Sequence, residues 1–393
     1  MSPLSEKFSL CSFKGKPTIL QVLPRLGVGG VEIGTLVIAE AIVKAGGRAL
    51  IASNMDNISI DNLPVGVEFK NLPLDTKNPF YISKNARLLK NLIQKENIDI
   101  VHVRSRAPAW SAYKAAHSAS VPFVTTYHAA YKAQTVFKTF YNSVMAKGDR
   151  VIAISQFISD HIIEKYQSYS WFDPSKIRLI QRGVDLHYFD PASLTKERVH
   201  HVRENWGVPP DMRLLLLPGR MSRNKGQELM IKALSLMKHA NVMLVFVGSA
   251  QGHESFRDDL LRYATTLDLE GRVKWMPPCS DLPAAYQLAD IIVCPSLVPE
   301  GFGRIMAEAQ AMKKPIVSSD HGAAREVIEH GITGWRTPPH DADAFAKALD
   351  DALDLPSEEL HAMGEKGRER VQAQFSKEAM CFKTIEIYKE LLK

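Results

Sequence analysis

Two glutamates stand eight positions apart in the segment PEGFGRIMAEAQAM, at Glu300 and Glu308. Glu308 falls within an apolar helical pattern, which predicts that its carboxylate is buried and needs a partner. A carboxylate one turn into a helix can accept hydrogen bonds from two vicinal ribose hydroxyls. The simpler alternatives are a helix-dipole or ion-pair role for Glu308 and a solvated loop carboxylate at Glu300.

Two loops in the second half of the chain have the chemistry to bind phosphate. In PGRMSRNKG, Arg220 and Lys225 lie five residues apart after a predicted strand, so together they can clamp a diphosphate without a metal. In EGFG, the backbone N–H groups of Phe302 and Gly303 are expected at a helix N-terminus, which favours a phosphate. The alternative for the first loop is an ordinary solvated basic loop.

A glycine-rich turn, PRLGVGGVEIG, follows the first predicted strand. Gly29 and Gly30 precede a helix expected from near Val31, so the backbone can approach a ligand and the helix N-terminus favours negative charge. The spacing differs from G-x-G-x-x-G, and no acidic residue clearly ends the second strand, which argues against a nicotinamide dinucleotide. A tight turn into the helix is the alternative.

No metal site is predicted. Asp341 and Asp343 form a D-x-D sequence, but they precede the helical stretch FAKALDDAL, so one of them is expected to cap that helix. The four cysteines, Cys11, Cys279, Cys294 and Cys381, are scattered and form neither a zinc-binding pattern nor a disulfide framework. We therefore expect reduced thiols, no metal and no other cofactor.

Short β-rich runs alternate with amphipathic helical stretches along nearly the whole chain, the pattern of parallel sheets with crossover helices. The predicted strands of the first half are TILQVLP, RALIAS, IDIVHVRS, PFVTTYHA, RVIAIS and IRLIQRG; those of the second half are RLLLLPGR, VMLVFVGS, RVKWMPP, DIIVCPS and PIVSSD. The predicted fold class is α/β, with two doubly wound domains at residues 1–190 and 191–375. Such sheets bind ligands at the carboxyl ends of their strands, where the candidate loops lie.

The 393-residue chain has a net charge of +6, which is unevenly distributed. Residues 1–190 contain 23 Lys and Arg against 15 Asp and Glu, so this half is expected to meet an acidic acceptor or an anionic membrane face. The absence of a recognised binding motif argues against nucleic acid. No apolar run approaches the roughly 20 residues that span a bilayer, and the N-terminus lacks a signal-peptide pattern, so a cytoplasmic location is expected.

Candidate acceptor-binding residues lie in the basic half. Arg104 and Arg106, in VHVRSRAPAW, follow a predicted strand. The later segment YKAQTVFKTFYNSVMAKGDR interleaves basic and aromatic residues: Lys132, Lys138, Lys147 and Arg150 with Phe137, Phe140 and Tyr141. Such a helix either packs one face on a core and exposes the other to water, or rests on an anionic membrane surface.

The ordered motifs LGVGGVE, TTYHA, IAISQFISD, IQRGVDLHYFDP, PGRMSRNKG, EGFGRIMAE and GITGWRTPPHDADAFAKAL resemble those of the retaining nucleotide-sugar glycosyltransferases of family four, group 1. The resemblance covers nearly the entire chain and implies two facing Rossmann-like domains of the GT-B type. It also implies that residues 376–393 form a helix that packs back on the first domain. The glycine-rich turn and RSRAPAWSA are in addition similar to bacterial transferases of lipopolysaccharide core assembly.

The resemblance implies a role for each candidate residue. Glu308 binds the donor ribose, and Glu300 lies by the donor sugar hydroxyls. Arg220 and Lys225 bind the diphosphate, and the glycine-rich turn approaches the phosphates or the sugar. His128 lies close to the donor sugar; its alternative is a satisfied histidine at a strand end.

The implied reaction moves a hexose from a nucleotide-diphosphate sugar, such as GDP-mannose or a UDP-hexose, to an anionic saccharide or lipid-linked acceptor of the cell envelope. Two cations and the EGFG amides would stabilise the leaving phosphate. No carboxylate of the first domain presents itself as a nucleophile. The resemblance implies front-face attack, with the leaving phosphate taking the acceptor proton. A nucleotide-sugar epimerase and a non-catalytic nucleotide-sugar-binding protein of the same fold stay as alternatives. A lipid-linked acceptor would place the protein peripherally on the inner face of the cytoplasmic membrane.

Overall fold

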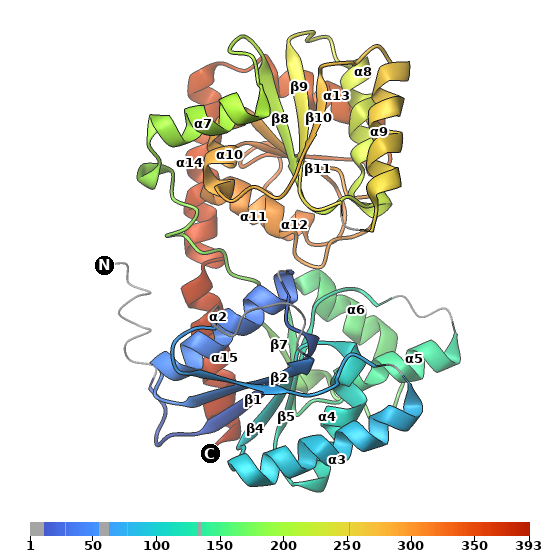
Figure 1. Ribbon diagram of the computed structural model, residues 1–393, viewed down its shortest axis with the longest axis vertical. Coiled ribbons are helices and arrows are strands. Elements are labelled where there is room, and N and C mark those ends of the chain that lie inside the picture. Colours follow the sequence, from blue (N-terminus) through green and yellow to red (C-terminus); the bar gives the residue numbers. More distant parts are fainter. Residues whose placement is uncertain (1–11, 28, 55–62, 77, 132–134, 251) are drawn as a thin grey trace. The chain divides into compact units, whose positions relative to one another are not determined.

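The computed structural model describes residues 12–27, 29–54, 63–76, 78–131, 135–250 and 252–393. The chain divides into two compact units, Met1–Gly183 together with Lys377–Lys393, and Val184–Ser376. The boundary thus follows Gly183, whereas the sequence placed it near residue 190. Each unit holds one parallel sheet with helices packed on both faces (Figure 1). The predicted class, α/β with two doubly wound domains, is confirmed.

The first unit is built on a seven-stranded sheet of order β3-β2-β1-β4-β5-β6-β7. Its strands are β1 (Thr18–Arg25), β2 (Arg48–Asn54), β3 (Val67–Asn71), β4 (Ile100–Val103), β5 (Phe123–Tyr127), β6 (Arg150–Ala153) and β7 (Ile177–Leu179). Its helices are α2 (Gly30–Lys44), α3 (Pro79–Glu96), α4 (Arg106–Ser118), α5 (Val136–Ser143), α6 (Gln156–Tyr166) and α15 (Lys377–Leu391). All these strand pairs are parallel, so the loops after β1, β4 and β5 leave the same edge of the sheet.

The last helix of the chain completes the core of the first unit. Helix α15 packs against α2, and Met380, Ile385 and Tyr388 share one buried cluster with Ile19 and Leu23 of β1. Burying a side chain of this size contributes about 1.5–3 kcal/mol. A chain end far away in sequence is therefore held by the apolar face that α2 and β1 present to it.

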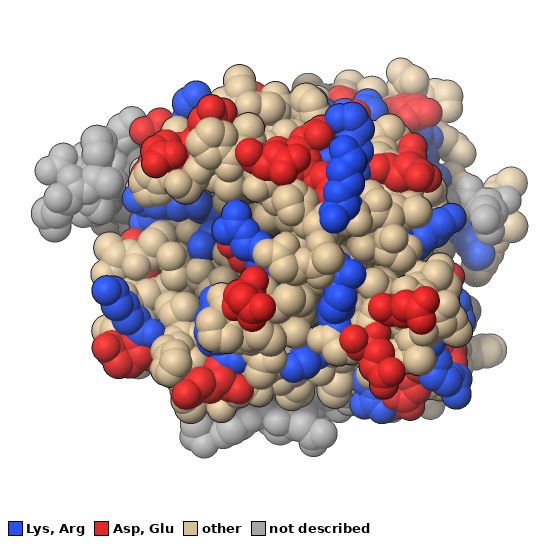
Figure 2. Space-filling model, turned by 90° about the horizontal axis from the view of Figure 1, so that it is seen from above, with Lys and Arg blue, Asp and Glu red and all other residues tan. Residues whose placement is uncertain are grey.

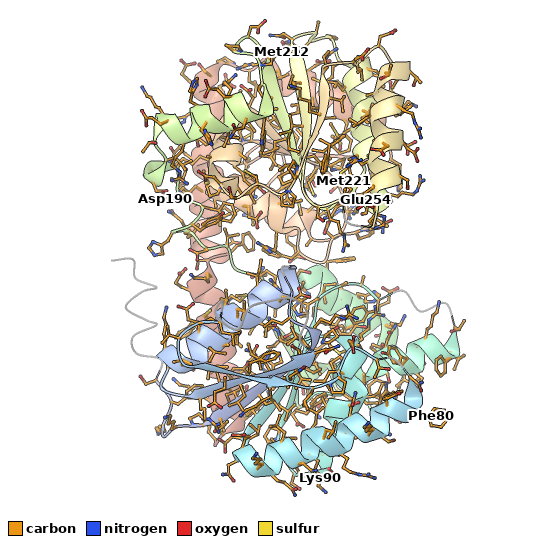
Figure 3. All side chains as sticks on the ribbon, viewed as in Figure 1. Phe80, Lys90, Asp190, Met212, Met221 and Glu254 are labelled. Atoms are coloured by element: carbon orange, nitrogen blue, oxygen red, sulfur yellow. The ribbon has the colours of Figure 1, made fainter. Side chains whose placement is uncertain are left out.

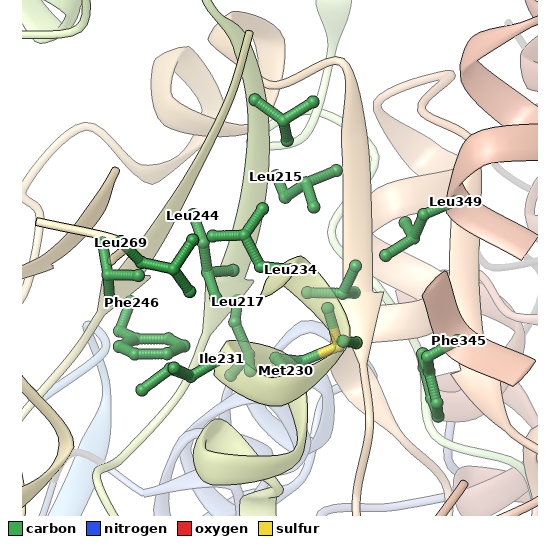
Figure 4. Close-up of a cluster of buried hydrophobic side chains, with 14 of the residues drawn as sticks. Leu215, Leu217, Met230, Ile231, Leu234, Leu244, Phe246, Leu269, Phe345 and Leu349 are labelled. Carbon is green, nitrogen blue, oxygen red and sulfur yellow. The ribbon is translucent and has the colours of Figure 1, made fainter. Parts of the chain in front are cut away.

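The second unit is built on a six-stranded sheet of order β10-β9-β8-β11-β12-β13. Its strands are β8 (Arg213–Pro218), β9 (Val242–Val247), β10 (Val273–Met276), β11 (Ile291–Cys294), β12 (Ile316–Ser319) and β13 (Trp335–Thr337). Its helices are α7 (Lys196–Trp206), α8 (Gln227–Leu236), α9 (Glu254–Thr266), α10 (Leu282–Leu288), α11 (Arg304–Ala311), α12 (Ala324–Val327), α13 (Ala342–Leu353) and α14 (Ser357–Gln374). Figure 4 shows the core, in which Leu217, Ile231, Phe246 and Phe345 come together from β8, α8, β9 and α13.

Two strands were not predicted, and both lie at an edge of their sheet. β3 is partly exposed along most of its length, and β13 has only three residues. On the face of the molecule drawn in Figure 2, acidic and basic side chains are interspersed. None of the helices in the described part of the chain has the length and apolar character needed to cross a bilayer.

Candidate active site

The loop that follows β8 presents the two predicted diphosphate-binding cations differently. Arg220 is exposed, and its side chain has no recorded partner among the described residues. Lys225 is partly buried at the end of a short 3-10 turn, Arg223–Lys225, and its Nζ lies 2.6 Å from Oε1 of Glu300. Gly219 lies next to Ile305 of α11, so this loop and the start of α11 are neighbours. The structure therefore places Lys225 beside Glu300 of the EGFG segment, and the loop that contains Arg220 beside the start of α11.

Glu300 is held from two sides. Its Oε1 accepts hydrogen bonds from Lys225 Nζ and from the Ser296 hydroxyl, each at 2.6 Å. Burial would raise the pKa of Glu300, but the charge and hydrogen bond of Lys225 outweigh it and the pKa is lowered. Burial would likewise lower the pKa of Lys225, and Glu300 raises it instead. Both groups are thus charged at neutral pH, and the solvated-loop alternative for Glu300 does not describe the contacts observed.

The start of α11 has the geometry of a phosphate-binding N-terminus. Gly303 is the N-cap with φ +79°, a left-handed backbone conformation that favours glycine. No side chain caps the helix. Phe302 is buried and packs edge-on against Phe375, with ring centroids 5.5 Å apart. The packed ring anchors the loop, and the first backbone amides of the helix are left to a ligand.

Glu308, the second glutamate of the pair, is 5% exposed, as its apolar helical pattern predicted. Its Oε2 accepts a hydrogen bond from the Tyr286 hydroxyl at 3.0 Å, and its Oε1 accepts one from Arg304 Nη2 at 2.7 Å. Burial, together with the charge of Glu308, raises the pKa of Tyr286 well above its usual value, so the phenol keeps its proton. The predicted need for a partner is met, and each oxygen retains acceptor capacity for a ligand hydroxyl.

In the first unit, Gly30, His128 and Arg182 come together. Arg182 Nη2 donates to the Gly30 carbonyl, and Arg182 Nη1 lies 3.4 Å from His128 Nδ1. A Cβ at Gly34 would come 2.8 Å from Arg182 Nη2, so a larger residue there would displace the guanidinium from its place against α2. Gly29 is the N-cap of α2, and the carboxylate of Glu32 lies against it.

His128 is neutral at pH 7 in this setting. Burial lowers its pKa well below the usual value, and the charges of Arg104 and Arg182 lower it further. Because a guanidinium can only donate, His128 Nδ1 is the acceptor and Nε2 carries the proton. His128 Nε2 is buried and has no hydrogen-bond partner among the residues that the structure describes. The ring is therefore not a fully satisfied histidine but offers one free N–H donor.

The two candidate acceptor-binding arginines occupy different settings. Arg104 directly follows β4 and is 3% exposed. Arg106 begins α4, donates to Asn142 Oδ1 at 2.9 Å and lies over the Tyr131 ring, 4.0 Å from its centroid. Arg106 is thus held by neighbours in the first unit, whereas the guanidinium of Arg104 is buried without a recorded hydrogen bond or ion pair in the described part of the chain.

The basic and aromatic segment after β5 does not form one surface. Lys132 lies outside the described residues. Lys138 is exposed on α5, but Lys147 lies over the Trp171 ring, 3.7 Å from its centroid, and Arg150 pairs with Glu390. Of the basic residues of this segment that the structure describes, Lys138 on α5 is the one exposed to a partner outside the unit.

The D-x-D sequence caps a helix, as predicted. Asp341 is the N-cap of α13 and its Oδ1 accepts from the Ala344 amide at 2.9 Å, while Asp343 lies in the first turn. Over the described residues, no group of three or more His, Cys, Asp or Glu side chains is placed to hold a metal ion.

Sequence reasoning did not single out Arg182, Tyr286, Ser296 or Arg304. A signal existed for one: Arg304 and Glu308 are separated by four residues in a predicted helix, the spacing of an ion pair. Ser296 and Tyr286 reach the glutamates through the fold, and Arg182 reaches His128 from a loop far along the chain. Such contacts leave no local pattern.

Several solved structures have the same architecture as this chain. A glycosyltransferase from Rickettsia africae ESF-5 is 38% identical, with 96% of this chain and 99% of that chain covered and a TM-score of 0.89. Anabaena Alr3699/HepE, solved in complex with UDP and glucose, is 20% identical over 95% and 100% of the two chains, TM-score 0.82. WaaG, a glycosyltransferase involved in lipopolysaccharide biosynthesis, is 16% identical over 94% and 99%, TM-score 0.71.

Comparison with curated protein sequences also finds glycosyltransferases. D-inositol 3-phosphate glycosyltransferase 1 of Catenulispora acidiphila is 29% identical over 225 residues, 55% of this chain and 51% of that protein. The chain thus spans about half the length of several of the curated relatives it matches. Residues 28–188 match the model of glycosyltransferase family 4, and residues 200–370 match that of the glycosyl transferases group 1. Two domain models together match most of the chain, and a 38% identical glycosyltransferase is covered over 99% of its length, so the chain belongs to the family 4, group 1 glycosyltransferases.

Proposed function

We propose that this protein is a retaining glycosyltransferase that moves a hexose from a nucleotide-diphosphate sugar to an anionic saccharide or lipid-linked acceptor of the cell envelope. The observation that supports this most is the ion pair of Lys225 with Glu300, set beside the uncapped start of α11. Within one unit this brings together the cation of Lys225, the carboxylate of Glu300, which suits sugar hydroxyls, and the α11 amides, which suit a phosphate.

In the proposed reaction the acceptor oxygen bonds to the anomeric carbon on the face from which the phosphate leaves. The bond from the anomeric carbon to the phosphate oxygen breaks, and the leaving phosphate takes the acceptor proton. Arg220, Lys225 and the α11 amides stabilise the charge that develops on the nucleoside diphosphate. Glu308 accepts from the ribose, and the Nε2–H of neutral His128 donates to a hydroxyl of the donor sugar.

We propose a UDP-hexose as the donor, because the HepE structure contains UDP and glucose; GDP-mannose is the comparison. After dialysis against excess EDTA, UDP-glucose or another UDP-hexose is expected to raise the melting temperature of the protein, because Arg220 and Lys225 supply the positive charge that a metal would. The measurement is thermal denaturation against a panel of nucleotide sugars with and without EDTA. Stabilisation only after magnesium or manganese is restored would contradict a metal-free diphosphate site.

The same samples distinguish a transferase from an epimerase and from a non-catalytic nucleotide-sugar-binding protein of the same fold. Incubation with the stabilising donor in the absence of acceptor, followed by proton NMR, would reveal a new sugar nucleotide if the protein were an epimerase. A transferase forms free UDP and a glycoside only when an acceptor is added, and the anomeric coupling constant of the product gives the stereochemistry. Binding without any turnover on a panel of anionic acceptors would favour a non-catalytic protein.

A surface on the first unit supports a peripheral membrane location. The aromatic surface comprises Phe80, Tyr81, Val136, Phe137 and Phe140, which are 48–88% exposed. Side chains of α3, α4 and α5 line a cavity of about 400 Å³ there, bordered by Lys114 and Lys138. These three helices contain seven Lys and Arg and a single acid, Glu96. Figure 3 shows Phe80 and Lys90 on α3, the helix at one side of this surface. We propose that the aromatic surface rests on an anionic membrane, at its cytoplasmic face.

A Phe137→Ser, Phe140→Ser double variant is expected to bind phosphatidylglycerol vesicles roughly 10²–10⁴-fold more weakly than wild type. Each buried aromatic side chain contributes about 1.5–3 kcal/mol, and each lysine near the surface about 1 kcal/mol. Sedimentation with vesicles is the measurement, and added salt should release the wild type. The matched control is Leu236→Ser, Ile332→Ser, two exposed apolar residues of the second unit. Equal sedimentation of the aromatic double variant and wild type would contradict the membrane location.

A further inference from the structure

The loop that follows β12 packs directly on the backbone of Glu300. Gly322, in this loop, has φ +59°, and a Cβ there would lie 2.6 Å from the Glu300 carbonyl oxygen. The same oxygen accepts a hydrogen bond from the Ala323 amide at 3.1 Å. Because β11 and β12 are neighbouring parallel strands, the loops that follow them leave the same edge of the sheet. The loop after β12 therefore holds the main chain of the glutamate assigned above to the donor sugar.

His321, in the same loop, holds a second point of the segment that contains Glu300. Its Nε2 lies 2.8 Å from the Ser296 carbonyl oxygen. Because a carbonyl oxygen can only accept, His321 Nε2 carries a proton and is the donor. The other ring nitrogen, Nδ1, is buried and has no hydrogen-bond partner among the residues that the structure describes. The hydrogen bond recorded for this imidazole is thus directed at Ser296.

The peptide unit that joins Ser296 to Leu297 is held at both of its polar groups. Its carbonyl oxygen accepts from His321, and its N–H, on Leu297, donates to the Asn224 carbonyl oxygen at 2.8 Å. A peptide unit is planar, so fixing the C=O and the N–H together fixes the orientation of the whole unit. His321 and Asn224 therefore determine how Ser296 is presented to its neighbours.

Ser296 is one of the two groups that orient the Glu300 carboxylate. Its side chain lies in a residue that is 2% exposed, and its hydroxyl donates to Glu300 Oε1 at 2.6 Å. Lys225 Nζ contacts the same oxygen at 2.6 Å. The second oxygen of Glu300, Oε2, has no recorded partner in the described part of the chain. Two donors thus hold Oε1, and Oε2 can accept from a sugar hydroxyl.

We propose that His321 is a positioning residue for the donor sugar. Its hydrogen bond to the Ser296 carbonyl keeps the serine hydroxyl, and through it the Glu300 carboxylate, in the orientation that binds the hydroxyls of the transferred hexose. The inference rests on the proposed function, which assigns Glu300 to that hexose. His321 acts through Ser296 and touches no substrate itself, so the contacts to the nucleoside diphosphate do not depend on it.

The test compares His321→Asn with His321→Gln, using UDP-glucose and UDP as ligands. The amide nitrogen of glutamine is as many bonds from Cβ as His321 Nε2 and can still donate to the Ser296 carbonyl, whereas asparagine reaches only as far as Nδ1. His321→Asn is expected to raise the dissociation constant of UDP-glucose roughly three- to tenfold, the effect of one neutral hydrogen bond, and to leave that of UDP unchanged. His321→Gln should keep most of the affinity for UDP-glucose. Calorimetry is the measurement.

Two results would overturn the proposal. If His321→Asn weakens UDP and UDP-glucose equally, His321 supports the whole site and does not act on the sugar. If His321→Gln behaves as His321→Asn, the hydrogen bond to the Ser296 carbonyl is not what matters. His239→Asn is the matched control: His239 precedes β9, at the opposite edge of the same sheet, and its Nε2 lies 3.0 Å from Asp354 Oδ1. This variant should bind both ligands as wild type does.

A double-mutant cycle tests the route through Ser296. Ser296→Ala removes the hydroxyl that contacts Glu300 and should weaken UDP-glucose without weakening UDP. Adding His321→Asn to Ser296→Ala should then have little further effect, because both changes act through the same hydroxyl. Additive losses would mean that His321 does not act through Ser296, and the proposal would be wrong.

A measurement on the free protein distinguishes failure of this proposal from failure of the proposed function. If wild type binds neither UDP-glucose nor UDP, the proposed function fails. The contact itself is then tested by nitrogen-15 NMR of protein labelled at histidine, with the His321 signals assigned by their loss in His321→Gln. Nε2 of His321 should carry a proton, as a donor to the Ser296 carbonyl must. A ring that carries its proton on Nδ1 alone would overturn the positioning role.

Discussion

Replacing Arg220 by methionine is expected to lower the rate of UDP formation from the donor by roughly 10²–10³-fold, with no change in melting temperature. Arg220 is exposed and has no recorded partner among the described residues, so the fold does not depend on its guanidinium. It follows β8, at the carboxyl edge of the sheet, where such folds bind ligands, and the proposed role for it is to stabilise the charge of the leaving diphosphate. Steady-state kinetics with UDP-glucose or the donor selected by stabilisation is the measurement.

Arg223→Met is the control for this variant. Arg223 lies in the same loop and is also exposed, but its guanidinium lies over the Phe256 ring, 5.0 Å from the centroid. The Arg223→Met protein should keep its full rate. If the two variants behave alike, the loss comes from the net charge of the loop, and if Arg220→Met keeps the wild-type rate, the diphosphate assignment is wrong.

The fold could be predicted because the internal strands are rich in apolar residues, and some of them are uninterrupted apolar runs. β9 and β11 are buried at every residue, which is what a parallel strand between two helical layers requires. The edge strands lack that signal. In β3, Glu68 and Lys70 alternate with Val67 and Phe69 and form ion pairs with helix and strand neighbours, so its sequence looks like a polar connection.

The candidate residues of the site could be predicted where chemistry and strand ends coincide, but their pairing could not. Lys225 and Glu300 were each expected in a strand-end loop; their mutual contact joins loops 75 residues apart in sequence and depends on β8 and β11 being neighbours. The burial of Arg104 could not be predicted either, because two of its neighbours, Tyr388 and Cys381, come from the other end of the chain. The local sequence shows which residue types are present, whereas the neighbours of each side chain are known only from the folded structure.

The contacts of Glu308 predict how a neutral replacement behaves. In Glu308→Gln, the amide oxygen can still accept from Arg304, and the amide nitrogen can donate to the Tyr286 oxygen once that hydroxyl turns. The fold should therefore be kept. What is lost is the negative charge toward the ribose hydroxyls, a charge-assisted hydrogen bond worth about 1.5–3 kcal/mol. The dissociation constant for the UDP-sugar is expected to rise roughly ten- to a hundredfold, as measured by calorimetry.

The ribose assignment can be tested with a changed ligand as well as a changed protein. If Glu308 binds the ribose hydroxyls, removing the 2′-hydroxyl from UDP should weaken binding to wild type but have little further effect on Glu308→Gln, because both changes remove the same interaction. Glu365→Gln is the control: Glu365 pairs with Lys313 at 2.6 Å in the same unit, and its loss should leave both ligands bound as in wild type. Additive losses from the two changes would mean that Glu308 acts through Arg304 or Tyr286 and not on the ribose, and unchanged affinity in Glu308→Gln would remove it from the donor site.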